Sequence, residues 1–97
     1  MRIRILDEAE WDLEDGRQFY EKQRPGLGSY FLNSLFSDID SLHLYAGIHR
    51  TCFGQYHRLL SKRFPFAIYY TLAEDVVSIH AVLDGRRKPS WIRKRLE

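Results

Sequence analysis

The sequence predicts a single α+β domain over residues 1–97, in which a helical hairpin covers one face of a small antiparallel sheet. Apolar residues recur at helical spacing before residue 45, whereas alternating and β-branched segments fill residues 55–83. The connections between these segments are short, which favours neighbours that pack against each other. With 97 residues, of which 44% are hydrophobic, the chain can build one core but not two. The expected order is β-α-α-β-β-β followed by a C-terminal tail or short helix.

The first elements are a short strand and a helix. Residues 2–6 (RIRIL) alternate, so that Ile3 and Ile5 share one face of a strand. Asp7 is predicted to be the N-cap of the helix, with Glu10 completing a capping-box-like pair. The apolar stripe of this helix consists of Ala9, Leu13, Gly16 and Tyr20. The sequence RPG at 24–26 ends the helix, because proline cannot continue the hydrogen-bond ladder and glycine permits a turn.

A second helix is predicted from about residue 27 to residue 45. Its apolar stripe consists of Phe31, Leu35, Ile39 and Leu42. Only a few residues separate the two helices, so they should pack as an antiparallel hairpin. Residues 46–54 show no clear periodicity and are expected to form a loop.

The second half of the chain is predicted to form a three-stranded antiparallel meander. The strands are residues 55–61, 66–72 and 76–83, joined by short turns. In the middle strand, Ile68, Tyr70 and Leu72 give an apolar face, and the opposite face is mixed. The segment DG at 84–85 ends the last strand. Pro89 is then expected to open a short terminal helix, with three side chains facing inward: Trp91, Ile92 and Leu96.

The charge distribution favours an anionic partner. Residues 1–48 contain five Lys/Arg and nine Asp/Glu, whereas residues 49–97 contain ten and four. The last twelve residues contribute six of those ten cations. A basic block of this kind suits nucleic acid or an acidic protein segment, and it is equally compatible with a solvated helix face that keeps the protein soluble.

Several classes of protein are disfavoured. Cys52 is the only cysteine, so no intrachain disulfide can form and a reducing cytoplasm is expected. No segment has the apolar length of a membrane span, and MRIRILDEAE lacks a signal-peptide core. The four histidines, His43, His49, His57 and His80, show no metal-binding spacing. No glycine-rich phosphate loop precedes a helix, so no metal and no cofactor are expected.

Three segments in this order resemble the RelE/ParE toxin superfamily. They are FYE at 19–21 with PGLG at 25–28, RFPFAIYY at 63–70, and AVLD at 81–84 followed by Arg86, Arg87 and Pro89. The resemblance covers nearly the whole chain. Within the superfamily, the chain is similar to ParE-like, plasmid-stabilisation proteins. The resemblance implies the toxin component of a bacterial type II toxin–antitoxin system. It also implies a cognate antitoxin, for which the basic C-terminus predicts an acid-rich wrapping segment. The open sheet edge and the helical hairpin are features to which such a segment can add a strand or a helix.

The resemblance leaves two mechanisms open. Members that cleave mRNA on the ribosome use Lys and Arg side chains of the sheet and, in several cases, a Tyr or His near the C-terminus. Cleavage of RNA without a metal requires acid–base groups and fixed cations of this kind. In this sequence Ala67 stands where an arginine is often found, and Trp91 and Ile92 stand where a catalytic Tyr is expected. The catalytic candidates that remain are weak: His57, Arg63, His80, Arg86 and Arg87. Strand histidines of this kind are more often structural.

The first hypothesis is therefore a ParE-like, non-enzymatic inhibitor of DNA gyrase that blocks growth through protein contacts. The alternative is a RelE-like, metal-independent endoribonuclease that acts on mRNA in the ribosome. A third possibility is an inactive relative that only binds antitoxin. The residues expected to contact the target or the antitoxin are Arg58, Lys62, Arg63, Arg86, Arg87, Trp91 and Arg93, because Arg and Trp dominate interface hot spots and cations grip phosphates.

Overall fold

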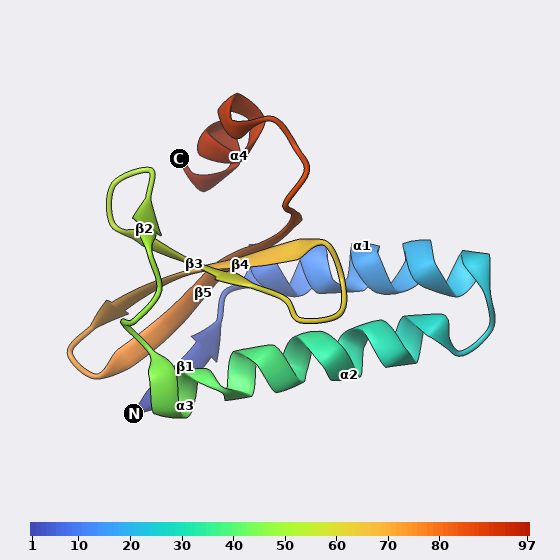
Figure 1. Cartoon of the computed structure of the whole chain (residues 1–97), viewed down its shortest axis with the longest axis horizontal. Helices are drawn as coiled ribbons and strands as arrows, with labels where there is room; N and C mark the ends of the chain where they lie inside the picture. Colours follow the sequence, from blue (N-terminus) through green and yellow to red (C-terminus); the bar gives the residue numbers. More distant parts are fainter.

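The computed structural model describes residues 1–97 and confirms the predicted α+β class with a helical hairpin on one face of a sheet (Figure 1). Its elements are β1 (Arg2–Ile5), α1 (Asp7–Gln23), α2 (Leu27–Asp40), α3 (Leu42–Tyr45), β2 (Thr51–Cys52), β3 (Tyr56–Leu60), β4 (Phe66–Ala73), β5 (Val76–Asp84) and α4 (Pro89–Leu96). None of these helices combines the length and the apolar character that crossing a membrane requires.

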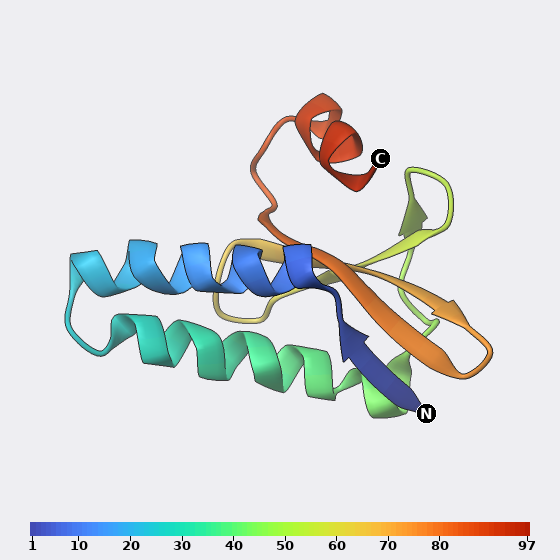
Figure 2. The same cartoon turned by 180° about the vertical axis from the view of Figure 1, so that it is seen from behind.

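The sheet is larger and more mixed than the sequence predicts. Its strand order is β1-β5-β4-β3-β2, so the predicted meander of β3, β4 and β5 is confirmed. The expectation of a purely antiparallel sheet is wrong at one edge, because β1 pairs with β5 in parallel (Figure 2). The expected loop at 46–54 contains β2, which pairs antiparallel with β3. Alternation in a sequence predicts which residues share a face, but it does not identify the neighbouring strand.

The hairpin of α1 and α2 covers one face of the sheet, and α4 lies on the other face in both views (Figures 1 and 2). The hairpin side holds the larger core, which we call the hairpin core: Ala9, Leu13, Phe31, Leu35, Ile39, Leu42, Ile68, Tyr70, Val77, Ile79 and Val82. This set contains the apolar stripes predicted for both helices, apart from Gly16 and Tyr20. Both residues contact Phe31. The rings of Tyr20 and Phe31 are stacked with their centres 5.2 Å apart, and a Cβ added at Gly16 would lie 2.5 Å from an atom of the Phe31 ring.

A second core, which we call the α4 core, lies on the opposite face of the same strands. It consists of Ala67, Tyr69, Ala81, Leu83, Ile92 and Leu96. Two corrections follow from it. The face of β4 expected to be mixed is buried under α4, and Leu72, expected on the apolar face, is 37% exposed at the end of the sheet. Trp91, expected to face inward, is 41% exposed, because α4 turns Ile92 and Leu96 toward the sheet.

Two helix boundaries also differ from the predictions. Leu6, not Asp7, is the N-cap of α1, and no side chain caps this end, so the predicted capping box does not form. The predicted helix over 27–45 is interrupted at Ser41, which separates α2 from α3. The Ser41 hydroxyl donates a hydrogen bond of 2.6 Å to the carbonyl of Asp38. Such a side-chain bond competes with the helical ladder and bends it.

Candidate functional site: a cleft between α1 and α4

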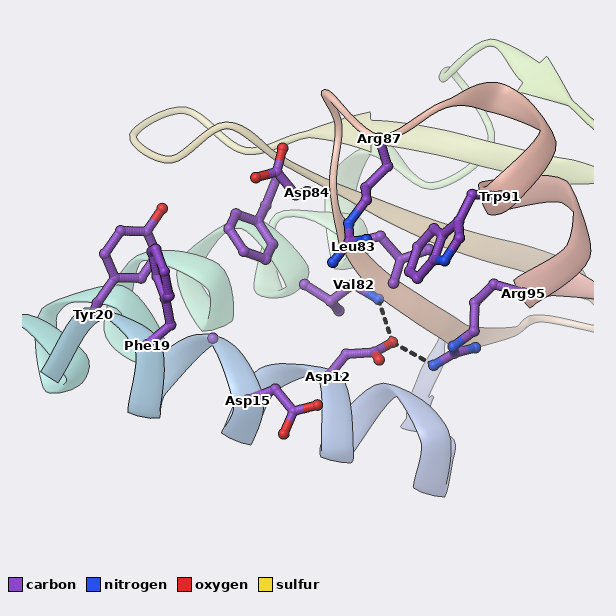
Figure 3. A pocket seen from close by; sticks show the side chains of 12 residues that line it. Asp12, Asp15, Phe19, Tyr20, Val82, Leu83, Asp84, Arg87, Trp91 and Arg95 are labelled. Atoms are coloured by element: carbon purple, nitrogen blue, oxygen red, sulfur yellow. Dashed lines mark hydrogen bonds and ion pairs between the residues drawn. The ribbon is translucent and has the colours of Figure 1, made fainter. Parts of the chain in front are cut away.

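A cleft of about 430 Å³ lies between α1, the end of β5 and α4 (Figure 3). Its apolar floor consists of Phe66, Val82 and Leu83. The wall from α1 contributes Asp12, Asp15, Gly16, Phe19 and Tyr20. The opposite wall contributes Arg87, Trp91 and Arg95, and Asp84 lies beside Tyr20. Apolar floors with a few charged groups at the rim are typical of binding sites.

The cleft exists because β5 extends beyond its parallel partner. β1 pairs with Val76–Ile79, so the later residues of β5 face α1 instead of a strand. The Asp12 carboxylate takes the place of a strand partner there, because one of its oxygens accepts a hydrogen bond of 3.0 Å from the Val82 N–H. The same oxygen accepts a bond of 2.6 Å from Arg95, which also lies 3.5 Å from Glu8. Asp12 thereby joins α1, β5 and α4.

The surroundings of Asp12 shift its pKa in opposite directions. Burial raises the pKa of Asp12 above its ordinary value, while the Val82 N–H and Arg95 lower it. The carboxylate is therefore stabilised by its two donors but incompletely compensated for the loss of water. The Asp12–Arg95 ion pair therefore links α1 to α4 and offers no unpaired charge to a ligand.

Arg86 and Arg87, adjacent in the sequence, have different surroundings. Arg86 forms a bidentate pair with Asp84, with bonds of 3.0 and 2.7 Å. These hydrogen bonds lower the pKa of Asp84 below its ordinary value. Arg87 has no carboxylate partner, and its guanidinium carbon lies 4.3 Å from the ring centre of Trp91. Stacking on an aromatic face leaves the planar N–H groups of an arginine available to a carboxylate or phosphate.

The two candidate catalytic histidines lie on opposite faces of the sheet. His57 stacks on Tyr70, a residue of the hairpin core, with ring centres 4.8 Å apart, and its Nδ1 lies 2.8 Å from the His49 carbonyl. His80 packs against the edge of Tyr56 under α4, and its Nε2 lies 2.9 Å from the Thr71 hydroxyl. One substrate phosphate cannot reach both rings.

The remaining predicted contact residues are spread around the α4 side of the sheet and its end. Arg58 donates to the Tyr69 hydroxyl over 3.2 Å, beneath α4. Arg93 lies over Phe53 at 5.5 Å, away from the cleft. The exposed Lys62 and Arg63 lie in the β3–β4 connection, where Arg63 is 6.0 Å from the ring centre of Tyr30. Of the predicted contact residues, Arg87 and Trp91 are therefore the two that line the cleft.

Metal binding and cysteine chemistry have little support in this geometry. No three His, Cys, Asp or Glu side chains are grouped closely enough to hold a metal ion. Burial raises the pKa of the Cys52 thiol, which keeps it protonated and weakly nucleophilic.

Sequence reasoning missed the α1 wall of the cleft and the role of Arg95. Asp12, Asp15 and Phe19 recur at helical spacing beside the apolar stripe of α1, so their shared face could have been noted. That this face meets α4 depends on the path of the tail, and no local pattern records it.

Comparisons with known proteins establish the fold. No protein-family model matches the chain, and no curated protein matches it either. A search of solved structures matches a chain described as "Chromosomal ParDE TA system from P. aeruginosa" with a TM-score of 0.80. The two sequences are 17% identical, and the match covers 87% of this chain and 95% of the other. The expectation of a RelE/ParE-like fold is confirmed.

Proposed function

We propose that this protein is the toxin component of a toxin–antitoxin pair and that it inhibits growth by contacting a target protein, DNA gyrase, without enzymatic activity. The observation that carries the proposal is that the candidate acid–base groups lie on both faces of the sheet, whereas Arg87 and Trp91 form a stacked pair on the α4 side. Cleavage needs its groups around one phosphate, whereas protein recognition needs anchored side chains on one surface.

The α4 side has the character of a recognition surface. Residues 85–97 contain six Lys/Arg and one acid, and Arg87 and Arg93 each lie over an aromatic ring. Stacked arginines are preorganised, so little side-chain entropy is lost when they bind. The likeness of the fold to the ParDE structure supports the same reading.

The inhibitor requires a neutralising partner, for which we propose a cognate antitoxin with an acid-rich C-terminal segment. Such a segment complements the cations of α4. The outer edge of β1, at the end of the sheet order, is available for strand addition.

A second candidate function is RelE-like cleavage of mRNA on the ribosome, and one observation favours it. His80 shares a hollow beside α4 with Lys94 and Arg95. Burial lowers the pKa of His80, with a further contribution from Arg4, which keeps the ring neutral and able to accept a proton. Arg95 is already bound to Asp12, however, which reduces the free positive charge of this site.

Two parallel assays on the purified protein separate these functions. The proposal predicts inhibition of gyrase supercoiling and intact mRNA on translating ribosomes. Cleaved mRNA together with unaffected supercoiling would overturn it in favour of the second function, and the variant His80→Gln should then be inactive. Harmless overexpression of the intact chain, with neither activity, would contradict both.

A further inference from the structure

We infer that the cleft between α1 and α4 is the anchor site for one segment of the antitoxin, in which an apolar side chain is followed by an acidic residue. This inference rests on the proposed function for the identity of the partner. The chemistry of the segment is derived from the cleft itself (Figure 3).

The interior of the cleft requires an apolar side chain. Its floor is formed by Phe66, Val82 and Leu83, and aromatic rings stand at both ends. Phe19 and Trp91 are these end residues, with 57% and 41% of their surface exposed. A volume of about 430 Å³ has room for one or two large side chains. Placing one there would remove two exposed aromatic rings from water, which is the main driving force that the site can offer.

The rim of the cleft determines where the acidic residue must lie. Asp12 is bound to Arg95 and Asp84 to Arg86, so these four charges are mutually neutralised. Arg87 is the cation of the cleft that lacks a carboxylate partner, and it lies on the α4 rim. The exposed Asp15 is on the α1 rim. An occupant therefore places its carboxylate toward α4 and keeps acids away from α1, which fixes its direction across the cleft.

The mode of binding follows from Asp12. A free strand edge in this position would invite strand addition. The Val82 N–H is already bound by the Asp12 carboxylate, so the edge of β5 is closed at the centre of the floor. Recognition in the cleft must then come from side chains, unlike strand pairing at the edge of β1.

The chain contains a built-in reporter pair for a test, because it has two tryptophans. Trp91 lines the cleft, whereas Trp11 is 74% exposed on α1 and does not line it. Their indole N–H signals can be followed by NMR while the intact protein is titrated with millimolar synthetic peptides. The probe is acetyl-Gly-Leu-Phe-Glu-amide, whose single acid follows the apolar pair, and the controls are its Lys-for-Glu and Ser-for-apolar counterparts.

Selective shifts of the Trp91 indole and of the Val82 and Leu83 amides, with Trp11 unchanged, are expected for the Glu peptide alone. Equal shifts of both indoles, an equal response to the Lys peptide, or no shift with the Glu peptide would overturn the inference.

Two neighbouring arginines provide a matched pair of variants. Arg87→Ala should weaken binding of the Glu peptide about ten-fold, as expected when a charge-assisted contact of about 1.4 kcal/mol is removed. Arg86→Ala removes the same charge at the next position, where it faces Asp84, and should change the affinity less than two-fold. Equal losses in both variants would reduce the effect to general electrostatics and contradict the assignment.

A cellular assay separates this inference from the proposed function. With the cognate antitoxin co-expressed, Phe19→Ala should keep growth inhibition but escape neutralisation, whereas Trp11→Ala, outside the cleft, should be neutralised like the wild type. Inhibition by Phe19→Ala that is still fully neutralised would contradict the cleft assignment and leave the toxin proposal intact. If the wild-type chain does not inhibit growth, the toxin proposal fails, whatever the peptide titration shows.

Discussion

The two faces of the sheet differ in how they are covered. The hairpin core contains 11 buried residues and a continuous aromatic cluster around Phe31, whereas the α4 core contains 6. The layer over the first face, residues 7–45, carries three Lys/Arg and nine Asp/Glu, while residues 85–97 carry six and one. The larger core should therefore contribute more to the stability. The smaller one attaches a basic helix whose outer surface stays exposed.

The largest effect should come from the hairpin core. Phe31 is fully buried and contacts the rings of Tyr20, Phe64 and Phe66. Phe31→Ala should lower the free energy of unfolding by about 3 to 5 kcal/mol, because it leaves a cavity that its aromatic neighbours cannot fill. Urea denaturation followed by circular dichroism measures this. A loss smaller than that of Ile92→Ala would reverse the ranking of the two cores.

A smaller and more local effect is expected from the α4 core. Ile92→Ala should cost about 2 kcal/mol, at the low end for such truncations, since a terminal helix can shift to close the gap. Amide exchange should accelerate over α4 and leave α2 protected. If α2 and α4 lose protection together, the two cores unfold as one unit and the comparison fails.

The link between the two sides should contribute little to overall stability. Asp12→Asn removes the attraction to Arg95 and also the cost of burying a carboxylate, while Arg95 keeps Glu8 as a partner 3.5 Å away, so the free energy of unfolding at pH 7 should change by less than about 1 kcal/mol. The pKa of Asp12 is raised in the folded protein, and the folded state therefore binds its proton more readily than the unfolded state. The stabilisation from that proton is complete below the ordinary pKa of 3.8 and is lost as pH rises through the folded value.

The wild type should consequently gain stability relative to Asp12→Asn as pH falls from 7 toward 4. Urea midpoints of both proteins across this range measure the difference. A relative gain with rising pH would mean that Arg95 dominates the site.

The smallest effect concerns His80, beneath α4. Burial lowers the pKa of His80 below its ordinary value of 6.5, so the unfolded chain takes up this proton first as pH falls. The contribution of His80 to stability is thus present above pH 6.5 and declines as pH drops through the folded pKa. His80→Gln should flatten the stability profile between pH 7 and pH 5 in thermal unfolding. An unchanged slope would show that His80 does not contribute to it.

The same division explains what the sequence could predict. The stripes of Phe31, Leu35 and Ile39 and the β-branched runs of β4 and β5 are local patterns, and they give the hairpin and the meander. The parallel partner of β1 and the position of α4 depend on contacts between distant segments. Asp12 and Val82 are 70 residues apart in the sequence, so no window of residues links them.

The candidate site was predictable only in part, for a related reason. The excess of cations in the tail indicated the α4 side, and Arg87 and Trp91 were identified from residue type alone. Composition could not distinguish Arg87 from Arg86 or Arg95, because pairing with Asp84 and Asp12 depends on tertiary placement. Arg86, Arg87 and Arg95 have the same formal charge, but in the folded protein Arg86 and Arg95 are paired with carboxylates and Arg87 is not.

The most direct test of a recognition surface on α4 is a gyrase supercoiling titration with the wild type and the triple variant Lys88→Ala, Arg93→Ala, Lys94→Ala. These side chains are exposed and form no salt bridge, so the variant should fold with an unchanged urea midpoint. The wild type should inhibit supercoiling, and the variant should need at least about ten times more protein for the same inhibition. Equal potency of the two proteins would mean that the cations of α4 do not contact gyrase.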